Sequence, residues 1–194
     1  MFGSLACGAV LLAGTAACSD GPKERPAASN PSKAPDKQSQ APQTPAELLQ
    51  QGVQQGQAGQ ADEAKKTFEK VLSLQADNKF AWFNLGYLAQ SRGLGSEAVT
   101  NYDKALEIDG SYRPAMFNKA LLLEAEKPDE ALALYRKIVD ADKAASTAYL
   151  RLGVMLDRRE DQKGARAAFT SAVAADGSLA SAVPAKYRPR KPAR

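Results

Sequence analysis

Histidine is absent from this 194-residue sequence, and cysteine occurs only twice. Without histidine the chain cannot form a Ser-His-Asp or Cys-His nucleophilic arrangement, and it lacks the commonest general base and metal ligand of proteins. Neither a GxxxxGK[ST] phosphate loop nor a GxGxxG dinucleotide motif is present. Clustered carboxylates, such as Asp157 with Glu160 and Asp161, fit a solvated helix surface. We therefore expect a protein that is not an enzyme and binds no cofactor, metal or small-molecule substrate.

The first 18 residues contain no charged side chain and form a single apolar run. The run is too short for a stop-transfer helix and fits the hydrophobic region of a signal peptide, which we place at residues 1–17. Its end, Thr15-Ala16-Ala17-Cys18, resembles the lipobox of bacterial lipoproteins, in which the signal peptidase cuts before a cysteine that receives a lipid. The resemblance implies lipidation of Cys18 and a lipid-anchored, extracytoplasmic location in the bacterial cell envelope. An ordinary secretory signal is the alternative, and the protein is then secreted.

Aromatic and branched aliphatic side chains are missing from residues 19–44, which are rich in proline, serine, lysine and glutamine. A segment of this composition cannot bury enough apolar surface to offset the entropy lost on ordering. We expect residues 18–44 to combine the lipidated cysteine with a disordered linker that spans roughly 30 Å or more. Such a linker would hold the following domain away from a membrane surface.

Acidic residues are missing from the last 15 positions, 180–194, where five lysines and arginines lie. The net charge of +4 therefore comes from this tail, and the rest of the chain is close to neutral. A basic tail on a neutral body does not indicate a nucleic-acid-binding face, so we expect no nucleic-acid partner. We predict that residues 180–194 form a short cap followed by a disordered basic tail that starts at about Lys186.

A pattern with a period of 34 residues fills most of the chain between positions 45 and 179. Its clearest copy predicts two amphipathic helices joined by a glycine-rich turn, with Ser96 as the N-cap of the second helix. The positions that this copy assigns to the core are Trp82, Leu85, Gly86, Ala98, Tyr102 and Ala105. In the other copies the bulky residue recurs as Leu48, Met116 and Tyr149, the glycine as Gly52, Ala120 and Gly153, the alanine as Ala64, Ala131 and Ala165, and the aromatic residue as Phe68, Tyr135 and Phe169.

This pattern resembles the tetratricopeptide repeat, a helix-turn-helix unit. The resemblance covers units at 45–78, 79–112, 113–145 and 146–179. It implies an all-α fold in which four helical hairpins stack as a right-handed superhelix, an α-solenoid. The sequence departs from the family pattern in the third unit, which is one residue short and has Lys119 where a leucine is usual.

In this family the first helix of each hairpin lines a concave groove that binds a segment of another protein. The resemblance places eleven residues there: Leu49, Val53, Phe83, Asn84, Tyr87, Phe117, Asn118, Leu121, Leu150, Arg151 and Val154. The apolar members have no evident core role, so we interpret them as an exposed interaction surface. Asn84 and Asn118 resemble the family's asparagines that bind an extended peptide backbone, with Arg151 next in line. Alternatively, this face closes on itself or on a capping helix.

The carboxylate clamp of chaperone-binding members is not reproduced, because Leu49, Val53, Pro114 and Thr147 occupy its positions. We therefore expect a non-catalytic protein–protein interaction scaffold, anchored in the bacterial cell envelope, that binds another protein or peptide segment in the groove. The alternative function is an accessory or targeting subunit of an envelope enzyme, secretion or cell-wall complex.

Overall fold

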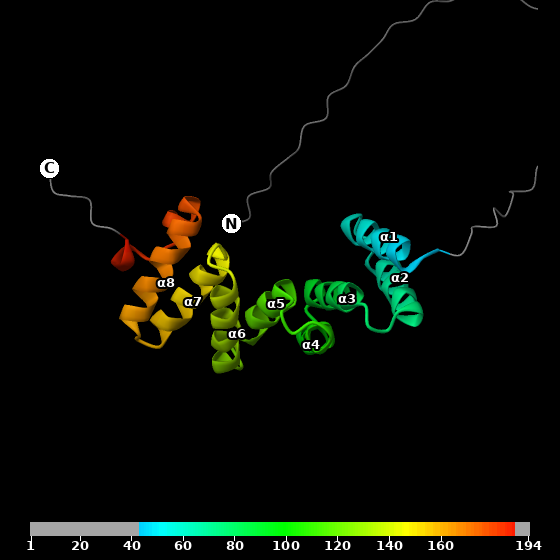
Figure 1. The fold of residues 1–194 in the computed structure, drawn as a ribbon, viewed down its shortest axis with the longest axis horizontal. Helices are drawn as coiled ribbons and strands as arrows, with labels where there is room; N and C mark the ends of the chain where they lie inside the picture. The colour runs from blue at the N-terminus through cyan, green and yellow to red at the C-terminus, as the bar shows by residue number, and fades with distance from the viewer. Residues whose placement is uncertain (1–42, 189–194) are drawn as a thin grey trace, which may run out of the picture. The chain divides into compact units, whose positions relative to one another are not determined.

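The computed structural model describes residues 43–188 of the chain. In this part of the chain eight α-helices pair into four consecutive hairpins, and no β-strand is present (Figure 1). The helices are α1 (Pro45–Gln57), α2 (Ala61–Leu74), α3 (Lys79–Ser91), α4 (Gly95–Ile108), α5 (Arg113–Leu123), α6 (Pro128–Ala141), α7 (Ser146–Arg158) and α8 (Gln162–Ala175). The all-α solenoid of helical hairpins predicted from the repeats is confirmed.

The segments assigned to the signal peptide, the Cys18 lipidation site and most of the linker lie outside the described residues, as do positions 189–194. Between residues 43 and 188, no helix is both long enough and apolar enough to span a membrane.

The first helix of each hairpin begins where the sequence pattern begins a new unit. Capping explains two of these starts. Thr44 and Glu47 form a capping box, in which the Thr44 amide donates to the Glu47 carboxylate at 2.8 Å. The Asn78 side chain accepts a hydrogen bond from the Ala81 amide at 2.9 Å. These caps end the preceding loop and fix where the helix starts.

The prediction that Ser96 caps the second helix of the second hairpin is wrong. The helix begins at Gly95, two residues earlier than a Ser96 cap implies, and its N-cap is Leu94, which makes no side-chain capping bond. Ser96 therefore lies inside the first turn, where its carbonyl accepts a hydrogen bond from the Thr100 hydroxyl at 3.0 Å. The turn is shorter than the sequence suggested, so the serine is already helical.

Each hairpin is held together by the predicted small and aromatic residues. In the second hairpin Ala98, Tyr102 and Ala105 are completely buried, and the equivalent aromatic residues of the other hairpins are also buried. Gly86 allows the two helices to approach, because a Cβ atom at this position would lie 2.6 Å from the Tyr102 ring. The equivalent glycines of the first and fourth hairpins face a phenylalanine ring in the same way.

Trp82 is less buried than predicted. It is half-buried, and it packs against the core of the first hairpin on one side and the core of the second on the other. Its indole N–H donates to the carbonyl of Ala76 at 3.0 Å, in the loop between these hairpins. Because this bond holds the polar edge of the ring at the loop, part of the indole stays at the surface.

Two short 3-10 turns, η1 (Gly177–Ser181) and η2 (Ala185–Tyr187), follow the last hairpin and pack on α8 (Figure 1). Tyr187 is buried, and its ring centroid lies 5.0 Å from that of Phe169. Lys186 forms an ion pair with Asp157 at 2.6 Å, and the Arg188 Nε donates to the Val183 carbonyl at 2.7 Å. The prediction that disorder starts at Lys186 is therefore wrong, because these contacts hold the chain through Arg188.

Candidate functional site

The eleven predicted site residues lie on α1, α3, α5 and α7, the first helices of the four hairpins, and together we call them the first-helix face. Ten of them are half-buried, whereas the Tyr87 side chain is 56% exposed. The structure brings most of them to the edges of three pockets, each formed where consecutive hairpins meet.

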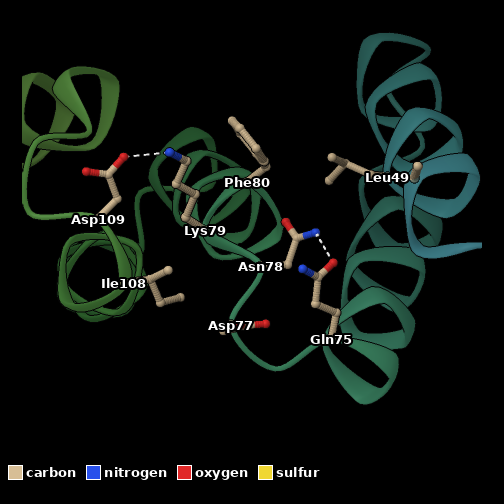
Figure 2. Close-up of a pocket in the computed structure, with 9 residues that line it drawn as sticks. Leu49, Gln75, Asp77, Asn78, Lys79, Phe80, Ile108 and Asp109 are labelled. Atoms are coloured by element: carbon tan, nitrogen blue, oxygen red, sulfur yellow. Dashed lines mark hydrogen bonds and ion pairs between the residues drawn. The ribbon is translucent and has the colours of Figure 1, made fainter.

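The first pocket lies between the first two hairpins and has a volume of about 650 Å³. Leu49 of α1 and Phe80 of α3 both line this pocket; in Figure 2 Leu49 points toward α3, whereas the Phe80 ring extends on the side of Lys79. Lys79 and Asp109 close one side of the pocket through an ion pair of 2.5 Å, also visible in Figure 2. The hydrogen bonds from Lys79 and Ser111 hold the pKa of the Asp109 carboxyl well below its usual range, so this ion pair stays charged.

The second pocket, of about 630 Å³, also lies between the first two hairpins. Three predicted residues line it: Val53 from α1, and Asn84 and Tyr87 from α3. The glycines of the α1–α2 hairpin, including Gly52 and Gly56, form part of its wall. This pocket therefore has small residues on one side and an exposed aromatic side chain on the other.

The third pocket has a volume of about 430 Å³ and lies where α3, α5 and α7 meet. It brings together the predicted residues Phe83, Phe117 and Asn118, with Pro114 and Thr147 beside them. The four remaining predicted residues are not among the lining residues of these three pockets: Leu121, Leu150, Arg151 and Val154.

Both predicted asparagines already make hydrogen bonds within the protein. The Asn84 amide donates to the carbonyl of Phe80, one helical turn earlier, at 2.7 Å. The Asn118 amide donates to the hydroxyl of Tyr102 at 3.3 Å. Each side chain therefore has fewer hydrogen-bonding groups left for a peptide backbone than the sequence suggested.

Arg151 forms an ion pair instead of continuing a line of peptide-binding amides. Its Nε donates to the Glu124 carboxylate at 2.7 Å, and a second guanidinium nitrogen binds the other oxygen of the same carboxylate. The Glu124 side chain is only 8% exposed, and Arg158 also lies 3.8 Å from its carboxylate, so two guanidinium groups offset the cost of burying this charge. Burial opposes the charge of Arg151, but the hydrogen bonds to Glu124 and Tyr135 prevail and raise the pKa of Arg151. Arg151 thus joins α7 to the end of α5.

The expectation that the apolar residues of this face have no core role is also wrong. Phe83 packs against the second-hairpin core, with its ring centroid 5.8 Å from that of Tyr102 and 5.4 Å from that of Tyr112. The other apolar members, apart from Tyr87, likewise contact the cores beneath them. They are half-buried because one side of each side chain packs on a core while the other side stays accessible.

Sequence reasoning missed two exposed apolar residues at the first pocket. Phe80 is 44% exposed and Ile108 is 40% exposed, and both line this pocket. Phe80 lies two positions before Trp82, the first core position of the repeat pattern. The family pattern does not assign this earlier position to the groove. An aromatic residue in the first turn of the helix, two positions after the N-cap Asn78, was the signal that could have identified it.

The sequence profile of the tetratricopeptide repeat family matches residues 49–113 and 121–180. A curated relative, the protein STIP1 homolog of Dictyostelium discoideum, is 36% identical over 101 residues, which are 48% of this chain and 18% of the relative. The chain thus corresponds to less than a fifth of that protein.

Solved structures with low sequence identity share the fold. The crystal structure of MamA superposes with a TM-score of 0.63 at 19% identity, covering 71% of this chain and 81% of MamA. A tetratricopeptide repeat protein from Parabacteroides merdae gives a TM-score of 0.62 at 18% identity, covering 69% of this chain and 54% of that protein. This fold is typical of protein–protein interaction scaffolds, which are generally non-catalytic. On the match of its repeats, the chain belongs to the tetratricopeptide repeat family.

Proposed function

We propose that this chain is a non-catalytic scaffold that binds a segment of a partner protein along the first-helix face of its first three hairpins. The observation that carries the proposal is the row of three pockets along α1, α3 and α5, with exposed Phe80 and Tyr87 at two of them. Exposed apolar surface beside a pocket is typical of an interaction site, and aromatic residues often contribute most of the binding energy.

The contacts of the polar residues favour one mode of binding over another. Because Asn84, Asn118 and Arg151 are engaged within the protein, they are poorly suited to hold the backbone of an extended peptide. The pockets can instead accept apolar side chains of the partner. We therefore infer a partner segment whose apolar side chains enter the pockets.

The binding surface can be tested by site-specific photo-crosslinking in cells, a method that captures a partner whose identity is unknown. A photo-reactive amino acid at position 87 should give a crosslinked species, whereas the same group at Arg136, exposed on α6, should not. The captured partner can then be used to measure affinity. Crosslinks from position 136 with none from position 87 would place the binding surface elsewhere.

The affinity measurement uses Tyr87→Ala, alone and with Phe80→Ala. The double variant should bind the captured partner with an affinity lower by about 2 kcal/mol, the usual threshold for an important interface residue. The melting temperature should change little for Tyr87→Ala, because this side chain is 56% exposed, and somewhat more for the double variant, because the Phe80 ring lies 5.7 Å from that of Tyr112. Lys104→Ala, on the exposed surface of α4, is the matched control and should bind like the wild type.

We also propose that Cys18 is lipidated and holds the protein at a membrane of the bacterial cell envelope. The support is the uncharged apolar run that ends in Thr15-Ala16-Ala17-Cys18, followed by a proline-rich segment. Cys18→Ala should move the protein from the membrane fraction to the soluble fraction while its helical circular dichroism stays the same. A mature protein that retains Met1, or whose mass shows no lipid, would rule out this anchor.

A further inference from the structure

A separate pocket, of about 470 Å³, lies at the C-terminal end of the repeats, between α8 and the two 3-10 turns. Its lining residues are Arg166, Phe169, Thr170, Val173, Ala180, Val183, Tyr187 and Arg188. No residue of the first-helix face contributes to it.

The inner wall of this pocket is apolar and well packed. Phe169, Val183 and Tyr187 are buried, with exposed fractions of 1%, 3% and 6%. Val173 on α8 is half-buried against the same core. A wall of this kind favours the apolar part of a ligand, and the volume lies in the range of sites for small molecules.

Two arginines supply positive charge at the pocket. Arg166 lies over the Tyr187 ring, 5.4 Å from its centroid, and donates a long hydrogen bond of 3.5 Å to the Lys186 carbonyl. Arg188 is fixed by hydrogen bonds to the carbonyls of Val183 and Ser181 at 2.7 and 2.6 Å. Within residues 43–188 neither guanidinium forms an ion pair. Helix α8 contains no aspartate or glutamate. The charge at this pocket is therefore complementary to an anion.

The other polar groups of the lining are already in use. The Thr170 hydroxyl donates to the Arg166 carbonyl at 2.9 Å. The Tyr187 hydroxyl donates to Asp157 at 2.7 Å, and the charge of Asp157 is balanced by Lys186. A peptide backbone would need donors and acceptors along its length, which these side chains do not offer.

We propose that this pocket binds a small acyl carboxylate. Its apolar chain would contact Phe169, Val173 and Val183. Its carboxylate would accept hydrogen bonds from the guanidinium N–H groups of Arg166 and Arg188 that the backbone carbonyls leave unused, since each guanidinium has five donors. Arginine suits this role because its planar group of donors matches the geometry of a carboxylate. The proposal is independent of the partner-binding function, since the two sites share no residue.

The test is isothermal titration of the purified full chain with decanoate, kept below its micelle concentration. Decanoate should bind saturably with one site per chain. Decanol and decylamine carry the same chain without the carboxylate, so they should bind at least about tenfold more weakly, as expected from the loss of charge-assisted hydrogen bonds. Equal affinity for decanol would overturn the proposal, because binding would then depend on the apolar wall alone.

Variants locate the binding. Arg166→Gln and Arg188→Gln should each weaken decanoate binding by about tenfold. Ala180→Trp, which places an indole at the exposed edge of the pocket, should abolish binding while thermal melting shows the fold retained. Arg136→Gln on α6 is the control that removes a positive charge elsewhere and should leave binding unchanged.

Three results contradict the proposal: no saturable binding of decanoate, undiminished binding by a folded Ala180→Trp variant, or binding of a peptide with an apolar C-terminal residue in place of decanoate.

Discussion

The second and third hairpins have a tyrosine at the same position of the repeat, but its hydroxyl meets a neutral side chain in one hairpin and a charged one in the other. In the second hairpin the Tyr102 hydroxyl donates to the Gln90 side chain at 2.7 Å. In the third hairpin the equivalent Tyr135 donates to the Glu124 side chain at 2.9 Å. A neutral amide needs no counterion, whereas the nearly buried carboxylate of Glu124 is paired with Arg151 from the next hairpin. The residue that accepts the tyrosine hydrogen bond is therefore neutral in the second hairpin, whereas in the third it is a carboxylate whose charge is balanced by the next hairpin.

The same two hairpins also differ in the residue that faces the tyrosine ring and in the length of the first helix. The second has Gly86 against the tyrosine ring, and the third has Ala120. Helix α5 is also shorter, with 11 residues against 13 in α3. The third hairpin therefore accommodates a methyl group at the position where the second leaves no space for one.

The largest effect is expected from Arg151→Met, which removes the nearer of the two cations beside Glu124; the other, Arg158, lies 3.8 Å from the same carboxylate. Glu124 is only 8% exposed, so the loss of its main partner leaves the charge poorly compensated even though Arg158 remains, and the free energy of unfolding should fall by about 2–3 kcal/mol. Urea denaturation measures this change. Adding Glu124→Gln, which copies Gln90 of the second hairpin, should restore most of the loss.

The control for this prediction is Arg159→Met, at the end of the same helix. Its ion-pair partner, Asp129, is 88% exposed, so the loss should be at most about 0.5 kcal/mol. If Arg151→Met cost no more than Arg159→Met, the two hairpins would not differ in the way described.

Gly86→Ala should have the next largest effect. Its new Cβ atom would lie 2.6 Å from the buried Tyr102 ring, and crowding of this kind outweighs the gain in helix propensity. We expect a loss of about 2 kcal/mol in thermal or urea unfolding. Gly95→Ala, where a Cβ meets no atom within 4 Å, should change stability by no more than about 0.5 kcal/mol. Equal effects at both positions would show that the close approach is not needed.

The smallest effect concerns alkaline pH. Burial raises the pKa of Tyr102 to about 12, whereas an unfolded tyrosine titrates near pH 10. Between these values the unfolded chain releases a proton that the folded chain keeps, so stability is complete below pH 10 and falls above it. Burial and the neighbouring Glu124 raise the pKa of Tyr135 as well.

We expect the free energy of unfolding to be lower at pH 11 than at pH 10 by about 1 kcal/mol per buried tyrosine. Urea denaturation at the two pH values measures the slope, and Tyr102→Phe should reduce it. A variant with the full wild-type slope would show that Tyr102 does not contribute.

The sequence predicted the features that each repeat encodes by itself. The period placed Ala98, Tyr102 and their equivalents in the core, because small and aromatic residues at fixed spacing are a local signal. The pairing of Glu124 with Arg151 was not predictable in this way, because it joins two units and depends on how the hairpins stack.

The sequence predicted which residues lie at the candidate site, but it did not predict how far their side chains are buried. The pockets contain Leu49, Val53, Phe83, Tyr87 and other residues chosen from the repeat pattern. Their burial could not be read from one repeat, because the neighbouring hairpin covers part of each side chain. The missed contacts were therefore those between units.

The pairing of Asp157 with the C-terminal turns has a consequence for the order of folding. Phe169 has no hydroxyl group, so the fourth hairpin cannot make the tyrosine bond found in the second and third. Tyr187 supplies that hydroxyl instead, and it donates to Asp157, 30 residues earlier in the chain. During synthesis the second hairpin can make its tyrosine bond as soon as its own second helix emerges, whereas the third also needs Arg151 of α7 beside Glu124. The fourth gains its contact with Asp157 only after residue 187 has left the ribosome, so its set of contacts is completed last.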